Sequence, residues 1–518
     1  MKHEIRAVVC LALPLVFSGC TVFTDYNSTT EDARQAFERG DFKTAYREYS
    51  EDLDATNDSL LYHLEAATTA HVGQMYEQSL PLFDKAYDKV VEYQNQALAM
   101  DALQMVGSVT VNEKTIPYSG AVFEQILMQA YNARNDYLRG NHGDVWSHVL
   151  HCWELQEKAR QIYKKELASY EQESRRKQSE NSRIDAGDVR AKMVAAYDYG
   201  DLSTAEDVYE INFVRYLNAW LVDAISAGST DDQNEAWIDL GYVLERFEHV
   251  EFIRRDWARL AEASGASGDA RELREKWDMP RLPNNYGSVT LFFECGMGPH
   301  LEEFGLIFPT YKGAAKFAMP IYKTTPNPVS GAVLRLGQHA QKSVVISDVD
   351  KIAFRYHQDR LPIMIAKQII RLIIKIGIQT GGTVAIEQST KGTKNEGVGK
   401  LAALGFSALT SAWNVISEQA DLRCWRTLPQ TYQVSRVYLP AGTYPCRIDL
   451  AGGGSYDLGT VVVEGGKHRM INARSLGRQL YWHLPPEPYD GVGSSSQASS
   501  SAGSQSPDSV TVDLTQQE

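Results

Sequence analysis

The stretch Tyr76-Glu77-Gln78-Ser79-Leu80-Pro81-Leu82-Phe83-Asp84-Lys85-Ala86 repeats an earlier part of the chain. In both copies an aromatic residue is followed, at similar spacings, by a small residue and a second aromatic residue. The two sets lie 34 positions apart and are Phe42, Ala45 and Tyr49, then Tyr76, Ser79 and Phe83. A small residue lets two helices approach closely, and the aromatic side chains fill the groove between them. The pattern predicts stacked helical hairpins over residues 31–275.

The repeated segment resembles a tetratricopeptide repeat. Gly40-Asp41-Phe42, with Ala45, is similar to the turn and second-helix start of such a repeat, and residues 76–86 are similar to the second helix of the next one. The period of 34 residues is also that of this repeat. Residues 137–141 and 199–205 echo the turn without the full pattern. A generic helical bundle is the alternative, and it too would consist of stacked helical hairpins.

The first twenty residues have the layout of an export signal. Lys2 and Arg6 precede a short apolar run over residues 7–17, which is too short to span a bilayer permanently. Phe17-Ser18-Gly19-Cys20 resembles the lipobox of bacterial lipoproteins, although Phe17 stands where Leu is more usual. The resemblance implies that residues 1–19 are removed and that Cys20 becomes a lipidated first residue. A plain signal peptide with an incidental cysteine is the alternative.

The residue after the cysteine bears on the final location. Thr21 stands there instead of Asp, and in many bacteria with two membranes this lets a lipoprotein travel to the outer membrane. The resemblance therefore implies a palmitate-type lipid anchor in the outer membrane, with the protein facing the periplasm. Residues 20–30 are mostly polar and are interpreted as a lipidated tether.

Composition narrows the class of protein. A chain of 518 residues is long enough for two or three domains. Its net charge of −14 argues against a nucleic-acid partner, which would need a basic face. No second apolar run extends over 18 residues without charges, so no transmembrane helix is expected after the signal. Residues 486–518 are rich in Ser, Gly and Gln and are predicted to be a disordered tail.

Four cysteines remain once Cys10 and Cys20 are set aside: Cys152, Cys295, Cys424 and Cys446. Their spacings match no zinc pattern. Cys424 and Cys446 lie in or beside neighbouring predicted strands, so a disulfide between them is one hypothesis and a dithiol is the other. His148, His151 and Cys152 lie close together without a carboxylate, which favours core or surface residues over a metal site. No cofactor fingerprint is found.

The composition changes after residues 276–286, where two prolines break the helical pattern. Residues 287–294 are rich in β-branched and aromatic side chains and predict a strand. Near the end, residues 432–439 and 444–450 are interpreted as one hairpin, and residues 460–463 and 468–473 as a second. The sequence thus predicts an α+β protein in which residues 285–480 form a mixed domain ending in a small β-sandwich-like unit.

A helix is predicted over residues 363–378, with Pro362 in its first turn. Lys367, Arg371 and Lys375 recur every four residues and form a basic stripe on an otherwise apolar helix. The favoured interpretation packs this helix between the helical repeats and the strands, with its cations facing acids there. A position on an anionic membrane surface and contact with an anionic polymer are the alternatives. Another apolar helix is expected over residues 401–418.

Polar residues around the strands form the main candidate cluster: Glu294, Asp421, Arg423 and Trp425. Glu294 with Glu303, or Asp421 with Arg423, could supply acid–base groups for hydrolysis. A structural role is favoured over catalysis. In that interpretation Arg423 is a paired or stacked arginine beside Trp425, with Asp421 and Glu294 as its partners.

The order of three segments resembles a group of largely uncharacterised bacterial lipoproteins with tetratricopeptide repeats. The segments are Phe293-Glu294-x-Gly296-x-x-Pro299-x-x-x-Glu303, Leu361-Pro362 with Arg371 and Lys375, and Ala420-Asp421-x-Arg423-x-Trp425-x-x-Leu428-Pro429. The basic residue common before Glu303 is replaced here by Leu301 and Glu302. The resemblance implies architecture and location and no established activity.

Together these features favour a scaffold lipoprotein and not an enzyme. Its concave helical surface would bind an envelope protein or peptide in envelope assembly or export. The first alternative is a glycan-binding or glycan-processing envelope protein that uses the C-terminal domain. A lipid-surface module built on residues 361–378 is the second.

Overall fold

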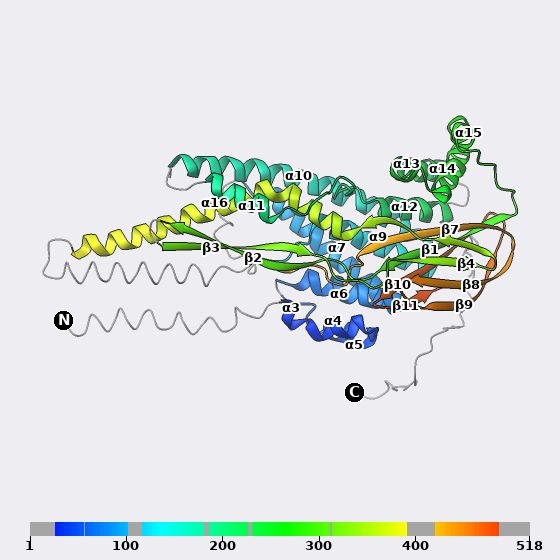
Figure 1. Ribbon diagram of the computed structural model, residues 1–518, viewed down its shortest axis with the longest axis horizontal. Helices are drawn as coiled ribbons and strands as arrows, with labels where there is room; N and C mark the ends of the chain where they lie inside the picture. Colours follow the sequence, from blue (N-terminus) through cyan, green and yellow to red (C-terminus); the bar gives the residue numbers. More distant parts are fainter. Residues whose placement is uncertain are drawn as a thin grey trace.

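The computed structural model describes residues 26–485, apart from residues 56, 102–115, 181–185, 226–229, 311–312 and 391–419. The export signal, Cys20, the helix expected over residues 401–418 and the tail over residues 486–518 lie outside the described residues. The described chain is α+β, with helices first and strands concentrated after residue 285 (Figure 1).

The helices that precede the first strand come one after another in the chain. They are α3 (Tyr26–Thr29), α4 (Glu31–Glu38), α5 (Phe42–Ser50), α6 (Ser59–Val72), α7 (Tyr76–Ala99), α9 (Val122–Arg139), α10 (His142–Glu180), α11 (Ala186–Ala196), α12 (Asn212–Ile225), α13 (Thr230–Phe247), α14 (Glu251–Ala263) and α15 (Ser267–Lys276). A further helix, α16 (Val349–Thr390), lies between the strands in sequence.

The repeated sequence pattern marks the starts of two helices. Phe42 is the first residue of α5, and the Asp41 carboxylate before it accepts a hydrogen bond from the backbone N–H of Thr44 at 3.2 Å. Gly40 has a φ of +79°, a conformation in which glycine meets no Cβ clash. Tyr76 likewise begins α7.

The small and aromatic residues of the pattern are in the core. Ala45, Tyr49, Ser79 and Phe83 are all buried. The small side chain of Ser79 lets α7 lie close to α6, and its hydroxyl donates to the backbone carbonyl of Ala67 at 2.7 Å. The side chains therefore pack as expected from the sequence, whether or not the helices form tetratricopeptide repeats.

The strands form two larger sheets and a hairpin. They are β1 (Tyr286–Cys295), β2 (His300–Thr310), β3 (Gly313–Lys323), β4 (Gly331–Leu336), β5 (His339–Lys342), β6 (Val344–Asp348), β7 (Thr431–Pro440), β8 (Gly442–Ala451), β9 (Ser455–Val463), β10 (His468–Leu476) and β11 (Gln479–His483). One sheet has the order β11-β10-β1-β7-β6 and the other β5-β4-β8-β9, while β2 pairs with β3. Only the pairing of β1 with β10 is parallel among the described strands.

Strand β1 is buried on both faces, because the five-stranded sheet lies between the helices and the four-stranded sheet (Figure 1). Successive side chains of a strand point to opposite faces. Val289, Leu291 and Phe293 pack in the apolar cluster shared with the four-stranded sheet. Phe292 belongs to the cluster shared with the helices, and Thr290 accepts a hydrogen bond from Trp220 of α12 at 2.9 Å. The helical part and the sheet therefore share one continuous core.

The two predicted hairpins are wrong, although their strands are confirmed. β7 and β8 belong to different sheets, and so do β9 and β10. The hairpins that form are β8–β9 and β10–β11. The sandwich is real, but the turns at residues 440–442 and 464–467 carry the chain from one sheet to the other instead of joining neighbouring strands.

One further expectation is corrected, and one open alternative is decided. Residues 26–30 are part of the fold and not of a polar tether, because Tyr26 is buried and the Asn27 amide donates to the backbone carbonyl of Leu422 at 3.0 Å. Cys424 and Cys446 are free, buried thiols in different apolar clusters, so the structure contains no disulfide between them. Burial raises the pKa of each thiol to about 12.

Helix α16 packs between α10, α11 and β3. Ile365 and Ile369 contact the cluster that holds Met193 and Met319, while Ile370 packs near Tyr170 of α10. This agrees with the favoured interpretation and covers the apolar side chains of residues 363–373, which a membrane-surface helix would have to expose. The Lys367 ammonium lies 4.9 Å from the centre of the Tyr170 ring, an aromatic contact where an acid was expected. Arg371 is half-buried, and the side chain of Lys375 lies outside the described part.

Pro362 is inside α16 and not in its first turn, since the helix already begins at Val349. The sequence signal for a helix start at Pro362 was therefore misleading.

Candidate functional site

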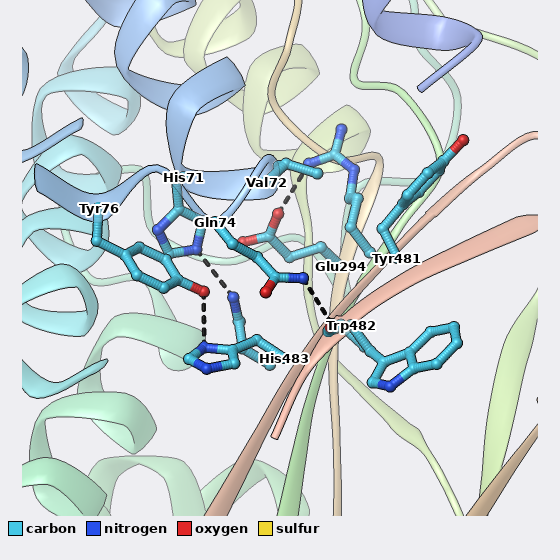
Figure 2. A pocket seen from close by; sticks show the side chains of 11 residues that line it. His71, Val72, Gln74, Tyr76, Glu294, Tyr481, Trp482 and His483 are labelled. Atoms are coloured by element: carbon cyan, nitrogen blue, oxygen red, sulfur yellow. Dashed lines mark hydrogen bonds and ion pairs between the residues drawn. The ribbon is translucent and has the colours of Figure 1, made fainter. Parts of the chain in front are cut away.

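A small cavity lies where helices α6 and α7 meet strands β10 and β11 (Figure 2). Its volume is about 10 Å³, which is room for about one water molecule. Around it the Tyr76 hydroxyl lies 2.9 Å from Nδ1 of His483, and the Gln74 amide donates to the backbone carbonyl of Trp482 at 2.9 Å. These contacts attach the edge strand β11 to the helical part.

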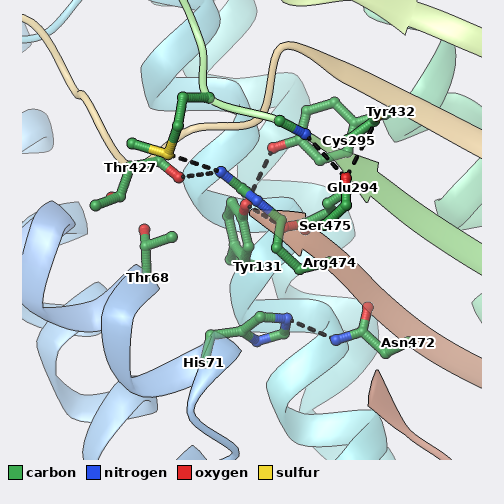
Figure 3. A network of polar contacts seen from close by, with 12 residues as sticks. Thr68, His71, Tyr131, Glu294, Cys295, Thr427, Tyr432, Asn472, Arg474 and Ser475 are labelled. Atoms are coloured by element: carbon green, nitrogen blue, oxygen red, sulfur yellow. Dashed lines mark hydrogen bonds and ion pairs between the residues drawn. The ribbon is translucent and has the colours of Figure 1, made fainter. Parts of the chain in front are cut away.

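Glu294 lies deeper, at the end of β1, on the face that looks toward the helices (Figure 3). One carboxylate oxygen accepts from Arg134 of α9 at 2.5 Å, and the other accepts from Arg474 of β10 at 2.9 Å. Tyr131, one helical turn before Arg134, donates its hydroxyl to Glu294 at 3.0 Å. Helix α9 thus presents two partners at i and i+3, which share one helix face.

The contacts continue into a hydrogen-bonded chain. Arg134 donates to Oδ1 of Asn472 at 3.1 Å, which leaves the Asn472 amide N–H to donate to Nε2 of His71 at 3.0 Å. Nδ1 of His71 then donates to Oδ1 of Asn135 at 2.6 Å. We call Glu294, Tyr131, Arg134, Arg474, Asn472, His71 and Asn135 the Glu294 network. It joins α6, α9, β1 and β10.

The charge states of Glu294 and His71 are set by burial and by the neighbouring arginines. Burial acts to raise the pKa of Glu294, but the positive charges of Arg134 and Arg474 outweigh it and lower the pKa to about 2. Burial and the nearby Arg134 lower the pKa of His71 to about 3. Glu294 is therefore ionised and His71 neutral near pH 7, as their hydrogen bonds require.

Arg423 is paired, as expected, but with a different set of residues. It contacts Asp421 at 2.7 Å and Asp58, just before α6, at 2.9 Å. It also donates to the backbone carbonyls of Asn57 and Ile116. Asp421 is confirmed as a partner, whereas Glu294 is not, because Glu294 is already engaged by Arg134 and Arg474. Glu303 accepts from the backbone N–H of Ala420 at 3.0 Å.

Trp425 lies in the core among helices α6, α7 and α9. Its indole N–H lies 3.1 Å from the Thr68 hydroxyl, and its ring is 5.7 Å from that of Tyr131 between centres. Its backbone N–H donates to Glu124 at 2.9 Å. Glu65 accepts from the next two backbone N–H groups, at 2.7 and 3.0 Å. Segment 423–427 is thus held by carboxylates from two helices.

Sequence reasoning found Glu294, Asp421, Arg423 and Trp425 but missed most of their partners. The missed residues are Glu65, His71, Glu124, Tyr131, Arg134, Asn472 and Arg474. One signal was present: Glu124 and Arg134 stand among apolar residues in α9, of which residues 122–137 are all buried. A buried charged residue needs hydrogen-bond or ion-pair partners, but the sequence does not say which ones.

A second buried network joins α12 and α14 to the same sheet. Asp223 accepts from Arg259 at 2.8 Å and lies 3.2 Å from His468 of β10. Asp256 pairs with Arg436 of β7 at 3.1 Å. The helical part is therefore connected to the sheet by buried ion pairs at two separate places.

The arrangement around Glu294 supports a structural role for this carboxylate more than a catalytic one. Both oxygens of Glu294 are engaged by arginines, so the carboxylate is not available to transfer a proton to a substrate. The neighbouring cavity is too small for a substrate. Among the residues that the structure describes, no group of three His, Cys, Asp or Glu side chains could hold a metal ion.

No family model, curated protein or solved structure matches this chain. The tetratricopeptide and lipoprotein resemblances thus stay predictions. In the described part of the chain, no helix combines the length and apolar character needed to cross a membrane.

The Glu294 network predicts a large stability effect from one substitution. Glu294→Gln leaves Arg134 and Arg474 buried beside a neutral amide, and we expect the free energy of unfolding to fall by roughly 3–5 kcal/mol. Urea unfolding of the purified protein measures this. The matched control is Glu77→Gln, which removes the exposed ion pair with Arg139 and should cost less than about 1 kcal/mol. Equal effects of the two substitutions would contradict the role given to Glu294.

The lowered pKa of His71 predicts that the stability of the protein depends on pH. Its pKa is about 3 in the folded chain, against an ordinary histidine value of 6.5, so between these values the unfolded chain binds a proton that the folded chain does not. Stability from His71 is therefore present above pH 6.5 and is lost as the pH falls, by up to about 1.4 kcal/mol per pH unit. Urea unfolding between pH 6.5 and 5 should show a steeper loss for the wild type than for His71→Gln. If the free energy of unfolding fell equally with pH in the wild type and in His71→Gln, His71 would not be held neutral by the fold. This window lies above the range in which Glu294 titrates.

Proposed function

We propose that the chain is a scaffold lipoprotein, anchored in the outer membrane through Cys20 and facing the periplasm, which binds a protein partner in envelope assembly or export. The anchor is supported by the lipobox-like sequence around Cys20. The scaffold role is supported by the way the sheet covers the inner helices and leaves other helices projecting from the fold.

The burial of the inner helices decides where on the molecule a partner can bind. All 14 residues of α6 and the first 16 of α9 are buried. A helix at the surface of a protein exposes one side, so burial all round means that these helices are covered by other parts of the chain. Part of that cover comes from segment 423–427 and strand β10. The helical surface expected to receive a partner is thus occupied by the chain's own C-terminal part.

A partner must therefore bind elsewhere, and the most extended part of the molecule is the clearest candidate. Helices α10, α11 and α16, with strands β2 and β3, project from the rest of the fold (Figure 1). We call this the arm. With 39 and 42 residues, α10 and α16 are each about 60 Å long at a rise of 1.5 Å per residue. A long projecting arm suits a protein that presents a binding surface away from its main body.

The glycan alternative has one supporting feature. Tyr76, Tyr481, Trp482 and His483 surround the small cavity of Figure 2, and aromatic rings commonly stack on sugars. A space for one water molecule does not admit a sugar ring, so we place this function second.

In-cell photocrosslinking tests the proposal. A photoreactive residue is placed at Val194 on the arm, whose side chain is 51% exposed, and at Val462 on β9, which is 48% exposed. We expect one discrete protein adduct from Val194, none from Val462, and loss of the adduct in Cys20→Ala because the protein is no longer anchored. An adduct unaffected by Cys20→Ala would contradict the anchored scaffold. Recovery of glycan in place of protein would favour the second function.

A further inference from the structure

Helix α10 carries apolar side chains on two opposite faces of its first half. The inner face is buried in the main core through Val145, Val149, Cys152 and Leu155. The outer face carries Trp146, Leu150 and Trp153, at the i, i+4 and i+7 spacing of a single helix stripe. A surface helix usually keeps its outer face polar. The outer stripe therefore has the composition of a face that packs against a further element.

The side chains of this stripe are accessible and already ordered. Leu150 is 40% exposed, and Trp146 and Trp153 on either side of it are partly exposed. The two indole rings lie edge to face, with 6.4 Å between their centres, and both pack against the core. A partner would thus meet side chains that lose little further freedom on binding. Tryptophan is also among the residues that contribute most to binding at protein interfaces.

A second exposed apolar stripe lies on α13. Ile238 is 44% exposed and Tyr242 is 47% exposed, and they stand four residues apart on one face of the helix. The Arg215 guanidinium of α12 lies over the Tyr242 ring, 4.1 Å from its centre. The same guanidinium pairs with Asp239 of α13 at 2.8 Å. These two contacts hold this part of α13 against α12.

Ion pairs connect the two stripes. Arg160 follows Trp153 by seven residues and shares its face of α10. Its guanidinium pairs with Glu210 at 2.7 Å, and Glu210 pairs with Arg215 at 3.4 Å. Because Arg215 also contacts Tyr242, the outer faces of α10 and α13 flank one row of charged side chains. The five apolar residues of the two stripes are called the outer patch: Trp146, Leu150, Trp153, Ile238 and Tyr242.

The carboxylates beside the outer patch indicate the charge of its occupant. Four exposed carboxylates stand three or four residues from a patch residue and so share its helix face: Glu154, Glu157, Glu235 and Glu245. No ion pair of these four groups is found within the described structure. The arginines between the stripes, Arg160 and Arg215, are by contrast already paired with acids. The unpaired charge around the patch is therefore negative, which favours a basic occupant.

This charge selects among the occupants that an apolar patch can have. An anionic membrane surface attracts basic segments, and it would be repelled by exposed carboxylates. A second copy of the chain, placed symmetrically, would bring the same carboxylates against their own kind. A basic partner protein avoids both problems. The straight stripe of Trp146, Leu150 and Trp153 runs for about 10 Å along α10, which suits the apolar stripe of another helix.

We propose that the outer patch binds an amphipathic helix of a partner protein, with its apolar stripe along α10 and basic side chains near Glu157 and Glu235. The inference rests on the proposed scaffold function and names the chemistry of the partner. Helix α10 is one of the helices of the arm, so the outer patch places the partner on the arm and on the neighbouring helix α13.

Binding of a defined peptide tests this. The probe is a fluorescent amphipathic peptide of about 14 residues, or about 21 Å when helical, with Leu at i, i+4 and i+7 and flanking Lys. A matched peptide carries Glu in place of Lys. Fluorescence anisotropy with the purified wild-type protein should show the basic peptide binding at least about tenfold more tightly than the acidic one.

Three variants assign the binding to the outer patch. Leu150→Lys places a positive charge at an exposed position of the stripe and should weaken the basic peptide about tenfold or more. Glu157→Lys combined with Glu235→Lys should reverse the preference, so that the acidic peptide binds better. Val462→Lys, at a similarly exposed position on β9, should change nothing. Circular dichroism and urea unfolding verify that all three variants fold as the wild type does.

Three results would overturn the inference. One is equal binding of the basic and acidic peptides. Another is binding of the basic peptide that Leu150→Lys leaves unchanged. The third is no peptide binding, together with a concentration-dependent dimer, seen by sedimentation, that Leu150→Lys abolishes. If the outer patch fails while the in-cell adduct from position 194 still depends on Cys20, the scaffold function stands and only its docking site is wrong.

Discussion

The carboxylate of Glu294, held between Arg134 and Arg474, is the interaction on which the arrangement of the molecule depends. The three charges are almost wholly removed from water, and such charges are tolerated only when they are paired and hydrogen-bonded. Each comes from a different element, namely β1, α9 and β10. The ion pairs are therefore satisfied only when the helices are seated on the sheet in one orientation. The Asp223 and Asp256 pairs impose the same condition at α12 and α14.

This constraint decides where function can be sought. With the inner helices covered by the sheet and by segment 423–427, the helical part does not offer the open surface typical of a repeat protein. The polar residues that looked most like a reactive site prove to connect parts of the fold. The arm is the part that projects from this joined body. We therefore propose that a partner is bound on the arm and not in the polar interior of the fold.

Much of the secondary structure could be predicted from local sequence. The starts of α5 and α7 follow from Gly40, Asp41 and the aromatic-small-aromatic spacing, and β7 to β10 follow from β-branched runs between turns. Strand pairing could not be predicted in the same way. The sequence of a turn such as Pro440-Ala441-Gly442 does not tell whether the turn joins two neighbouring strands of one sheet or connects the two sheets of a sandwich. Pro362 misled because its effect depends on where the helix starts. The partners of Glu294 lie 160 and 180 residues away in sequence, and no local pattern carries that information.

The central claim is that the helical part and the sandwich are one cooperative unit. Native-state hydrogen exchange at increasing denaturant, read out at amides of α9 and β1, tests it most directly. We predict that both sets of amides exchange through the same opening, with the same free energy and the same dependence on denaturant. If the amides of α9 became exchangeable at a clearly lower free energy while those of β1 stayed protected, the helices would open independently of the sheet, and the account given to Glu294 would be contradicted.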